Sequence, residues 1–304
     1  MITKHDGLPI KKILSLGKPV ILHFTVTTLG NTKWEKGVMK WQDMIERIGD
    51  LIKQGLDPEF ITLRIDPIIP GVTKINEVER LIKRASELGI KHVRFSILDY
   101  YKSTAPDMIK LGFDYSKYFD PDGTGGFKRN ARDDYRQGVA TTIKAMTDKY
   151  GMDLSTCAEG SLIPGVKKEG CLSPHAINEI LGTHIADKEE LNNNSRELCT
   201  CYGGKQDILS YNVNCASVCT YCYAHHGSDR MVEYYDEDGT LKDNDLTRTT
   251  KGRAFATQNT EHKEVLDSDQ QEGNKQSDLF KELGISEDDM KKAEEVKNHC
   301  KGGK

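Results

Sequence analysis

Residues 60–99 decide the fold, and they read FITLRIDPIIPGVTKINEVERLIKRASELGIKHVRFSILD. Apolar strand patterns cover 60–65 and 91–98, and each is followed by an aspartate. Between them, apolar residues recur every three or four positions from Asn76 to Leu88, the spacing of one helix face, and Gly89 is a typical helix stop. A strand, a crossover helix and a second strand predict a parallel, right-handed β-α-β unit.

The same alternation continues on both sides of this unit. Further strands and helices are expected, in chain order, at 19–26, 38–54, 131–150, 152–157, 173–181 and 207–213. Residues 100–129 carry Pro, Asp and Gly signals and are predicted to form a loop. Five clear strands are too few for a complete eight-stranded barrel, which typically needs ~250 residues. We therefore expect an α/β fold with parallel strands, either a partial TIM-like (β/α) barrel or an open sheet, with function at the carboxyl ends of the strands.

Composition separates the chain into two parts. The 304 residues are 30% charged with a net charge of -4. No apolar run approaches the ~18 residues of a membrane span, and the first residues do not form a signal peptide, so we expect a cytoplasmic protein. Residues 1–226 are expected to form the barrel domain. Residues 227–304, with 13 basic against 19 acidic side chains, are predicted to be an acidic, partly disordered extension with short C-terminal helices.

The cysteine loop, residues 215–222 (CASVCTYC), directly follows the strand expected at 207–213. Its cysteines are spaced C-x3-C-x2-C, and they are Cys215, Cys219 and Cys222. Three thiolates on one short loop can hold three corners of a [4Fe–4S] cluster and leave the fourth iron open to a small molecule. The alternatives are a zinc site completed by His225 or His226, or plain thiols.

A second group of cysteines precedes this loop: Cys157, Cys171, Cys199 and Cys201. In a reducing compartment such a group is more often metal-binding or redox-active than disulfide-bonded. Four thiolates make a closed site for a second iron–sulfur cluster or a structural zinc, so these residues form a candidate second metal site. The alternative is that some of them are small buried hydrophobic residues.

Acidic residues follow several of the expected strands. Asp66, Asp99 and Glu159 could bind a ligand or do acid/base chemistry, although a capping or turn role is the simpler interpretation of each. Arg64, inside a strand, needs an anionic partner. His23 is expected to be a hydrogen-bonded core histidine rather than a ligand.

Two sets of motifs resemble known families. The cysteine loop, with Tyr221 before its last cysteine, is similar to the cluster signature of the radical S-adenosylmethionine enzymes, and CTYCYA at 219–224 is similar to their spore photoproduct lyase branch. A second set of motifs runs along the chain in this order: FTVT at 24–27, LRIDPI at 63–68, FSILD at 95–99, STCAE at 155–159, RELCTC at 196–201 and the final cysteine motif. Through these motifs the chain resembles, over about residues 3–226, domain-of-unknown-function family number 1848.

These resemblances imply a cofactor and a chemistry. Cys215, Cys219 and Cys222 would hold a [4Fe–4S] cluster whose open iron is chelated by S-adenosyl-L-methionine, and electron transfer would cleave that cofactor to a 5'-deoxyadenosyl radical. Tyr221 would pack near the adenine or shield the cluster. Contacts with cofactor or substrate are expected from Arg64, Asp66 and Glu159. A flavodoxin- or ferredoxin-type reductant is implied as a partner. The resemblance to the lyase branch suggests nucleic acid as substrate, but the acidic extension gives this suggestion little support.

The order of the motifs has a structural consequence. In radical enzymes of this type the cysteine loop usually follows the first barrel strand, whereas here it follows the last expected strand, so we expect a circularly permuted version of that fold. Members of family 1848 usually begin with a further strand segment. We do not recognise that strand segment in this sequence. Without it the barrel could stay open, or the extension or another polypeptide could take the place of the segment. The alternative function is a non-catalytic metal-binding module, with zinc or a closed cluster, whose acidic tail binds a partner.

Overall fold

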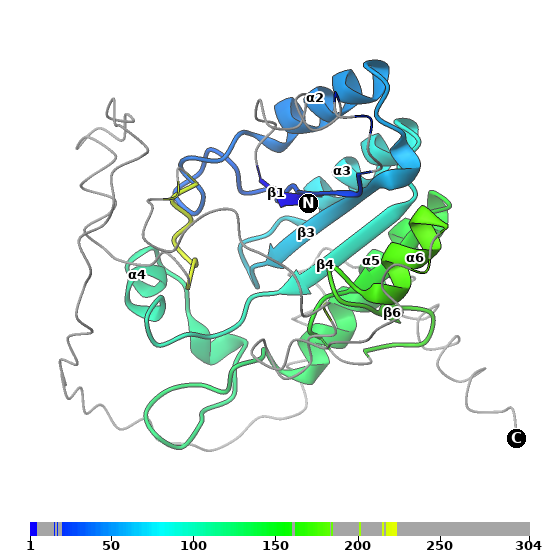
Figure 1. The fold of residues 1–304 in the computed structure, drawn as a ribbon. Helices are drawn as coiled ribbons and strands as arrows, with labels where there is room; N and C mark the ends of the chain where they lie inside the picture. The colour runs from blue at the N-terminus through cyan, green and yellow to red at the C-terminus, as the bar shows by residue number, and fades with distance from the viewer. Residues whose placement is uncertain are drawn as a thin grey trace, which may run out of the picture.

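The computed structural model describes residues 1–4, 15, 17, 20–159, 162–182, 184, 201, 215 and 217–223. Within them, six parallel strands form one sheet in the order of the chain (Figure 1). The strands are β1 (Ile2–Thr3), β2 (Leu22–Thr25), β3 (Ile61–Ile68), β4 (His92–Ile97), β5 (Asp153–Thr156) and β6 (Lys167–Lys168). The parallel α/β fold expected from the sequence is therefore confirmed.

The strands differ from the expectation at both edges of the sheet. β1 and β6 have two residues each, too few for a periodic pattern, and the sequence analysis missed both. β3 was expected to end before Asp66, but it continues to Ile68 through a register shift against β4. The strand expected at 207–213 lies outside the described residues, so its place in the sheet stays a prediction.

The helices follow the expected positions closely. They are α2 (Trp41–Lys53), α3 (Ile75–Glu87), α4 (Ala105–Lys110), α5 (Asp133–Lys149) and α6 (Pro174–Leu181), with short 3-10 helices η1 (Pro58–Phe60) and η2 (Tyr115–Lys117). The loop predicted at 100–129 is wrong in part, because it contains α4 and η2. Pro106 is compatible with this helix, because it occupies the first turn of α4, where proline is favoured. Met108 is fully buried, and Phe113 packs edge-on against Tyr115 with ring centroids 4.6 Å apart, so apolar burial holds this segment in place.

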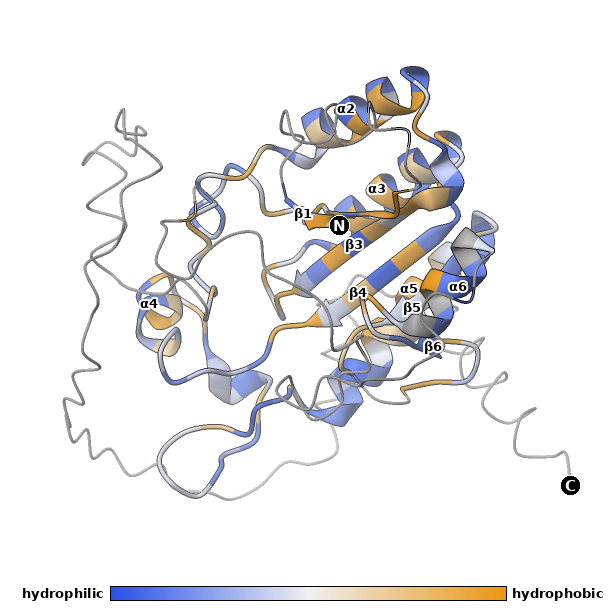
Figure 2. Ribbon diagram, viewed as in Figure 1, coloured by the Kyte–Doolittle hydropathy of each residue, from blue (hydrophilic) through white to orange (hydrophobic). Residues whose placement is uncertain are grey.

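The sheet has one apolar and one polar face, because side chains alternate along each strand. Figure 2 shows this alternation as orange and blue bands along β3 and β4. Leu63 and Phe95 of the apolar face share one core with Ile48 of α2, Leu81 of α3 and Ile143 of α5, and all five are fully buried. The three long crossover helices therefore cover the apolar face.

The polar face carries two rows of aligned side chains. The first row is His23, Thr62, His92 and Asp153, and the second is Thr25, Arg64, Arg94 and Ser155. Sequential strand order with the crossover helices on one face is the arrangement of a (β/α) barrel, whereas a doubly wound sheet has helices on both faces. The described strands do not close into a barrel, so they form a partial TIM-like barrel whose interior face is polar.

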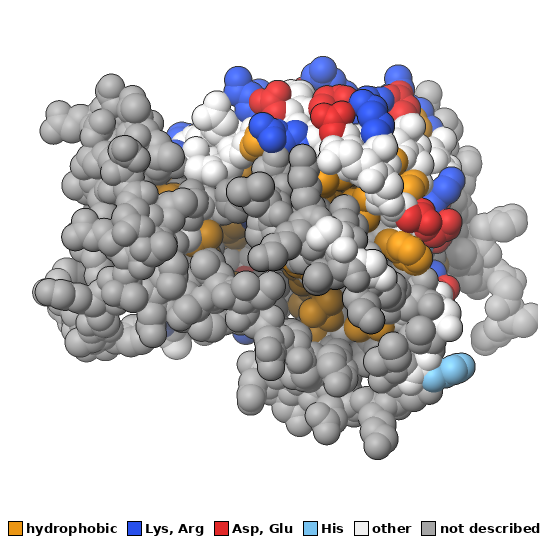
Figure 3. Space-filling view, turned by 45° about the horizontal axis from the view of Figure 1, so that its top comes forward, with side chains coloured by type: hydrophobic (Ala, Val, Ile, Leu, Met, Phe, Trp, Pro, Cys, Tyr) orange, Lys and Arg blue, Asp and Glu red, His pale blue; other side chains and the backbone are white. Residues whose placement is uncertain are grey.

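The outer surface of the helices is well solvated. Figure 3 shows basic and acidic side chains interspersed on this surface. Arg84 of α3, for example, pairs with Glu46 and Glu87. None of the helices within the described residues has the length and hydrophobicity needed to cross a membrane.

Candidate functional site: the cysteine loop and the carboxyl edge of the sheet

The cysteine loop lies beyond the carboxyl ends of β3 and β4, where Figure 1 shows it in yellow. It pairs with the segment after β2: Glu35 and Cys219 form an antiparallel bridge, and the Thr220 amide donates to the Trp34 carbonyl at 3.0 Å. Within the loop, the Val218 amide donates to the Cys215 carbonyl and the Cys222 amide to the Cys219 carbonyl. Two successive turns thus place the three cysteines on one compact loop.

Gly30 makes the partner segment possible. A Cβ at this position would lie 2.0 Å from the carbonyl oxygen of Met39. The backbone can approach that closely only at glycine. Gly30 also bridges to Glu35, so the close approach fixes the turn that presents Glu35 to the cysteine loop.

A buried network of four side chains, which we call the loop anchor, joins the loop to the sheet: Lys4, Thr27, Glu35 and Tyr221. Glu35 is fully buried and accepts hydrogen bonds from Lys4 at 2.8 Å, from the Tyr221 hydroxyl and from the Thr27 hydroxyl. Lys4 follows β1, and its Nζ also lies 2.5 Å from the Tyr221 hydroxyl and 3.8 Å from Cys219 Sγ. The ends of β1 and β2 are therefore tied to the middle of the cysteine loop.

Electrostatics in the loop anchor centre on Lys4. Burial acts to lower the pKa of Lys4, but its interactions with Cys219 and Glu35 outweigh burial and raise the pKa, so the ammonium stays charged. Burial raises the pKa of the Cys219 thiol to about 12, and Lys4 acts in the opposite direction. Burial also raises the pKa of Tyr221 well above its usual value, so its hydroxyl remains a donor. Metal ligation requires a thiolate, and Lys4 is the cation placed to favour it at Cys219.

The donor set of the loop fits an iron–sulfur cluster in its chemistry and its spacing: three thiols with no carboxylate or imidazole among them. Across the described part of the chain, however, no three His, Cys, Asp or Glu side chains stand in an arrangement that could hold a metal ion. Cys215, Cys219 and Cys222 therefore remain predicted ligands, brought together on one loop by the backbone.

Each carboxylate that the sequence analysis singled out has protein partners at the carboxyl edge. Asp66 accepts from Arg64 and from Ser96, and its charge reaches Lys4. Arg64 thus has the anionic partner that its place in a strand required, and it also donates to Thr25 at 2.8 Å. The contacts with Arg64 and Ser96 therefore tie Asp66 to the polar face.

The other two carboxylates support the loops that follow β4 and β5. Asp99 is buried and accepts from Arg129 and Asn130, both at 3.2 Å. Glu159 accepts from the Ile97 amide at 2.7 Å and from Arg136 at 3.0 Å. Burial raises the pKa of Glu159 to about 7, against the opposing effects of Ile97 and Arg136. These contacts give Asp99 and Glu159 a positioning role in the fold, and ligand binding by either residue stays a prediction.

The second cysteine group is brought together in part. Cys157, Cys171 and Cys201 form a buried cluster, with 3.2 Å between the sulfurs of Cys157 and Cys171. Contact with Cys157 and Cys201 lowers the pKa of Cys171, and Arg64 acts in the same direction, whereas the contact with Cys171 raises the pKa of Cys157. Cys199 lies outside the described residues, so the four-cysteine metal site stays untested.

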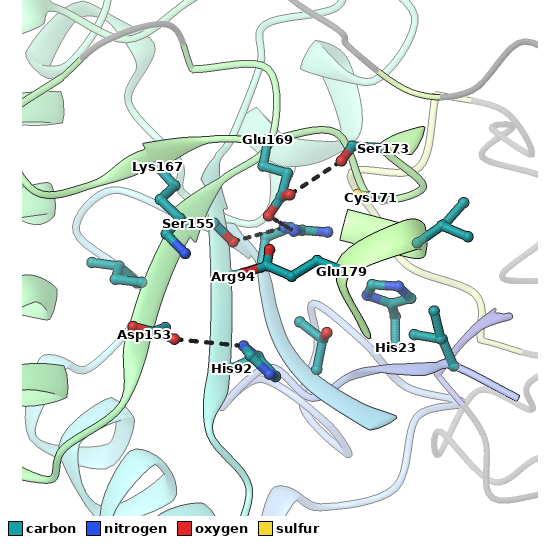
Figure 4. A pocket seen from close by; sticks show the side chains of 14 residues that line it. His23, His92, Arg94, Asp153, Ser155, Lys167, Glu169, Cys171, Ser173 and Glu179 are labelled. Carbon is teal, nitrogen blue, oxygen red and sulfur yellow. Dashed lines mark hydrogen bonds and ion pairs between the residues drawn. The ribbon is translucent and has the colours of Figure 1, made fainter. Parts of the chain in front are cut away.

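A small cavity opens on the polar face, next to this cysteine cluster (Figure 4). Arg94 crosses it, donating to Ser155 and to Glu169, both at 2.9 Å. Cys171 and His23 also line the cavity. His23 was expected to be hydrogen-bonded, but it is buried with no partner for Nδ1, and burial together with the charge of Arg94 lowers its pKa to about 3.

Tyr221 stands out in the sequence, but its anchoring partners Lys4 and Glu35 do not. Lys4 and Tyr221 are 217 positions apart, and Glu35 and Tyr221 are 186 positions apart. Glu35 stands in the polar run KWEK at 33–36, which reads as a solvated loop. No periodic or motif signal in a single sequence identifies such a pairing.

The fold is a partial (β/α) barrel with a polar interior face, and a three-cysteine loop lies at its carboxyl edge. In α/β proteins of this class, the functional site lies at that edge. The chain belongs to the family described as Domain of unknown function (DUF1848), whose model matches residues 4–224. The resemblance stated from the motifs is thereby confirmed.

A curated protein is also similar to part of the chain. It is the "Radical SAM Nalpha-GlyT isomerase" of Pseudomonas phage M6, which is 24% identical over 146 residues. The aligned part is 44% of this chain and 30% of the phage protein, so the chain spans less than a third of that relative. No solved structure matches the chain.

Proposed function

We propose that this protein is an iron–sulfur enzyme of the radical S-adenosylmethionine type, with Cys215, Cys219 and Cys222 as the iron ligands. The observation that carries the proposal is the position of the cysteine loop, fixed by a buried ion pair at the carboxyl edge of a partial (β/α) barrel. Membership in the family and the name of the phage relative support it. When bound, a [4Fe–4S] cluster with one open iron supplies a site for S-adenosyl-L-methionine and the electron for its cleavage.

The loop anchor has a defined part in this function. Lys4 places a positive charge 3.8 Å from Cys219 Sγ, which favours the thiolate that iron requires. Glu35 holds Lys4 and Tyr221 in position through hydrogen bonds from both side chains. We assign Tyr221 the shielding role, because its ring is buried against the core and its hydroxyl is committed to Glu35. Arg64, on the polar face, and Asp66, its ion-pair partner, are the proposed contacts for a bound cofactor or substrate.

The proposed partners and location follow from the same chemistry. A cluster of this kind receives its electron from a flavodoxin- or ferredoxin-type protein. The described cysteines are in the thiol form and not in disulfides, which suits a reducing cytoplasm; they are Cys157, Cys171, Cys201, Cys215, Cys219 and Cys222. The mixed charge of the helical surface supports neither a nucleic-acid track nor a membrane partner.

Anaerobic reconstitution with iron and sulfide tests the ligand assignment. The full chain should bind about four iron atoms per cluster site and gain a broad visible absorption, which should change when S-adenosyl-L-methionine is added. Cys219→Ala should lose both signals, and Cys300→Ala, a thiol of the extension, is the matched control that should keep them. A colourless protein that holds one zinc per chain, or an unchanged spectrum in Cys219→Ala, would contradict the assignment.

A further inference from the structure

The sulfur pair Cys157 and Cys171 has no part in the proposed cluster site. Cys157 follows β5, and Cys171 follows β6, which pairs with β5. The backbone therefore brings the two thiols together on the polar face, at 3.2 Å between sulfurs. Both are nearly buried, at 9% and 5% exposure. A disulfide needs about 2.05 Å between sulfurs, so the pair lies just over 1 Å from bonding distance.

The surroundings make the two thiols unequal. Cys171 lines the cavity on the polar face, whereas Cys157 is absent from the lining of that cavity. A small reagent in the cavity therefore meets the sulfur of Cys171. The Cys157 amide donates to the Phe95 carbonyl, which holds Cys157 at the end of the sheet. Cys171 is therefore the attacking sulfur and Cys157 its neighbour.

Access to the pair comes through the cavity in Figure 4. Cys171 lines this cavity together with His23 and Arg94, and its volume is about 50 Å³. One water needs roughly 10–15 Å³ of such space, so the cavity admits a few molecules of that size and excludes bulky reagents. Hydrogen peroxide is a two-electron oxidant small enough to enter.

We propose that Cys171 and Cys157 form a redox-active dithiol that hydrogen peroxide oxidises to a disulfide. The Cys171 thiolate attacks one peroxide oxygen, the O–O bond breaks, and a sulfenic acid and hydroxide form. The Cys157 thiol then attacks the sulfenic sulfur, the S–O bond breaks, and the departing oxygen leaves as water with the Cys157 proton. The hydroxide takes up the proton that Cys171 had released. Two thiols and one peroxide give one disulfide and two waters.

Oxidation of the full chain with limiting hydrogen peroxide, followed by alkylation and peptide mapping, tests the proposal. A peptide pair linked through Cys157 and Cys171 should form first and should disappear on thiol reduction. In Cys157→Ser, the sulfenic acid should persist at Cys171 and react with dimedone. In Cys171→Ser, neither the link nor dimedone labelling at Cys157 should appear. Cys300→Ser is the control and should leave the link unchanged.

Further measurements keep the proposal open to refutation even if a serine variant folds poorly. In the folded wild type the Cys157–Cys171 link should form at least tenfold faster than in urea, where the contact is lost. Equal rates would overturn the proposal, as would a first link that joins other cysteines. Stoichiometric zinc or iron retained by a Cys215→Ala/Cys219→Ala/Cys222→Ala variant, with peroxide resistance at Cys171, would show a metal site in place of the dithiol. None of these readouts depends on cluster assembly, so the proposed enzyme activity is judged separately.

Discussion

Replacing Glu35 with glutamine removes the negative charge that Lys4 needs in the loop anchor. Glutamine keeps the size of the side chain and can still accept a hydrogen bond from Tyr221. The Lys4 ammonium, with 20% of its side chain exposed, loses its 2.8 Å carboxylate partner, and the fully buried Glu35 site becomes neutral. Removing one partner of a buried ion pair typically costs about 3–5 kcal/mol. Because Lys4 is partly exposed, we expect a loss near the lower figure, about 3 kcal/mol in the free energy of unfolding.

Urea denaturation of the metal-free chain under reducing, anaerobic conditions measures this loss. Lys4→Met alone should also destabilise, since it leaves the Glu35 carboxylate buried without its cation. The double variant, Glu35→Gln with Lys4→Met, should lose about 2–3 kcal/mol less free energy of unfolding than the two single variants lose in sum, because it leaves neither charge unpaired. The matched control is Glu46→Gln, which breaks the exposed pair with Arg84 and should cost no more than ~1 kcal/mol. Equal losses for Glu35→Gln and Glu46→Gln, or additive single variants, would refute the reasoning.

Three further predictions concern the core, the polar face and the loop. Phe95→Ala should lower the free energy of unfolding by about 3–5 kcal/mol in the same assay, because this ring is fully buried. Folding lowers the pKa of His23 to about 3, so the folded state holds this side chain neutral. The resulting contribution to the free energy of unfolding is complete above pH 6.5 and amounts to up to about 5 kcal/mol. It is lost as the pH falls from 6.5 toward 3, because the unfolded chain binds the proton first. His23→Gln should flatten that acid limb of the stability profile, and an unchanged limb would contradict the pKa. Tyr221→Phe should cost about 1.5–3 kcal/mol through its lost bond to Glu35 yet keep the reconstituted cluster spectrum, so loss of that spectrum would give Tyr221 a more direct role.

Local sequence patterns predicted most of the helices and strands of the fold. The 3,4 spacing of apolar residues located α2, α3 and α5 to within about three residues at each end, and the helix expected at 173–181 is α6, which begins at Pro174. Each of these helices buries one face, and a buried face requires apolar residues at a regular spacing that can be recognised in the sequence. β1 and β6 were missed because two residues in an edge strand bury too little to leave a pattern.

The sequence identified the cysteine loop, whose three cysteines remain predicted ligands, but it did not identify Lys4 and Glu35, which help to hold this loop in place. The spacing of cysteines can be read directly from a sequence, so the cysteine loop is recognisable without a structure. Lys4 and Glu35 are ordinary charged residues in the sequence, and their importance comes from the fold, which places Lys4 beside Cys219, 215 positions away. The pairing of Cys157 with Cys171 likewise depends on β6, an element the sequence did not reveal.

The central claim is that the cysteine loop supports cleavage of S-adenosyl-L-methionine. Its most direct test is to incubate the anaerobically reconstituted, reduced protein with S-adenosyl-L-methionine and quantify 5'-deoxyadenosine. Wild type should form it in an amount that grows with protein concentration and time, and Cys219→Ala should form none above the protein-free background. Equal yields from the two proteins, or background yield from a wild type that carries a complete cluster, would contradict the account.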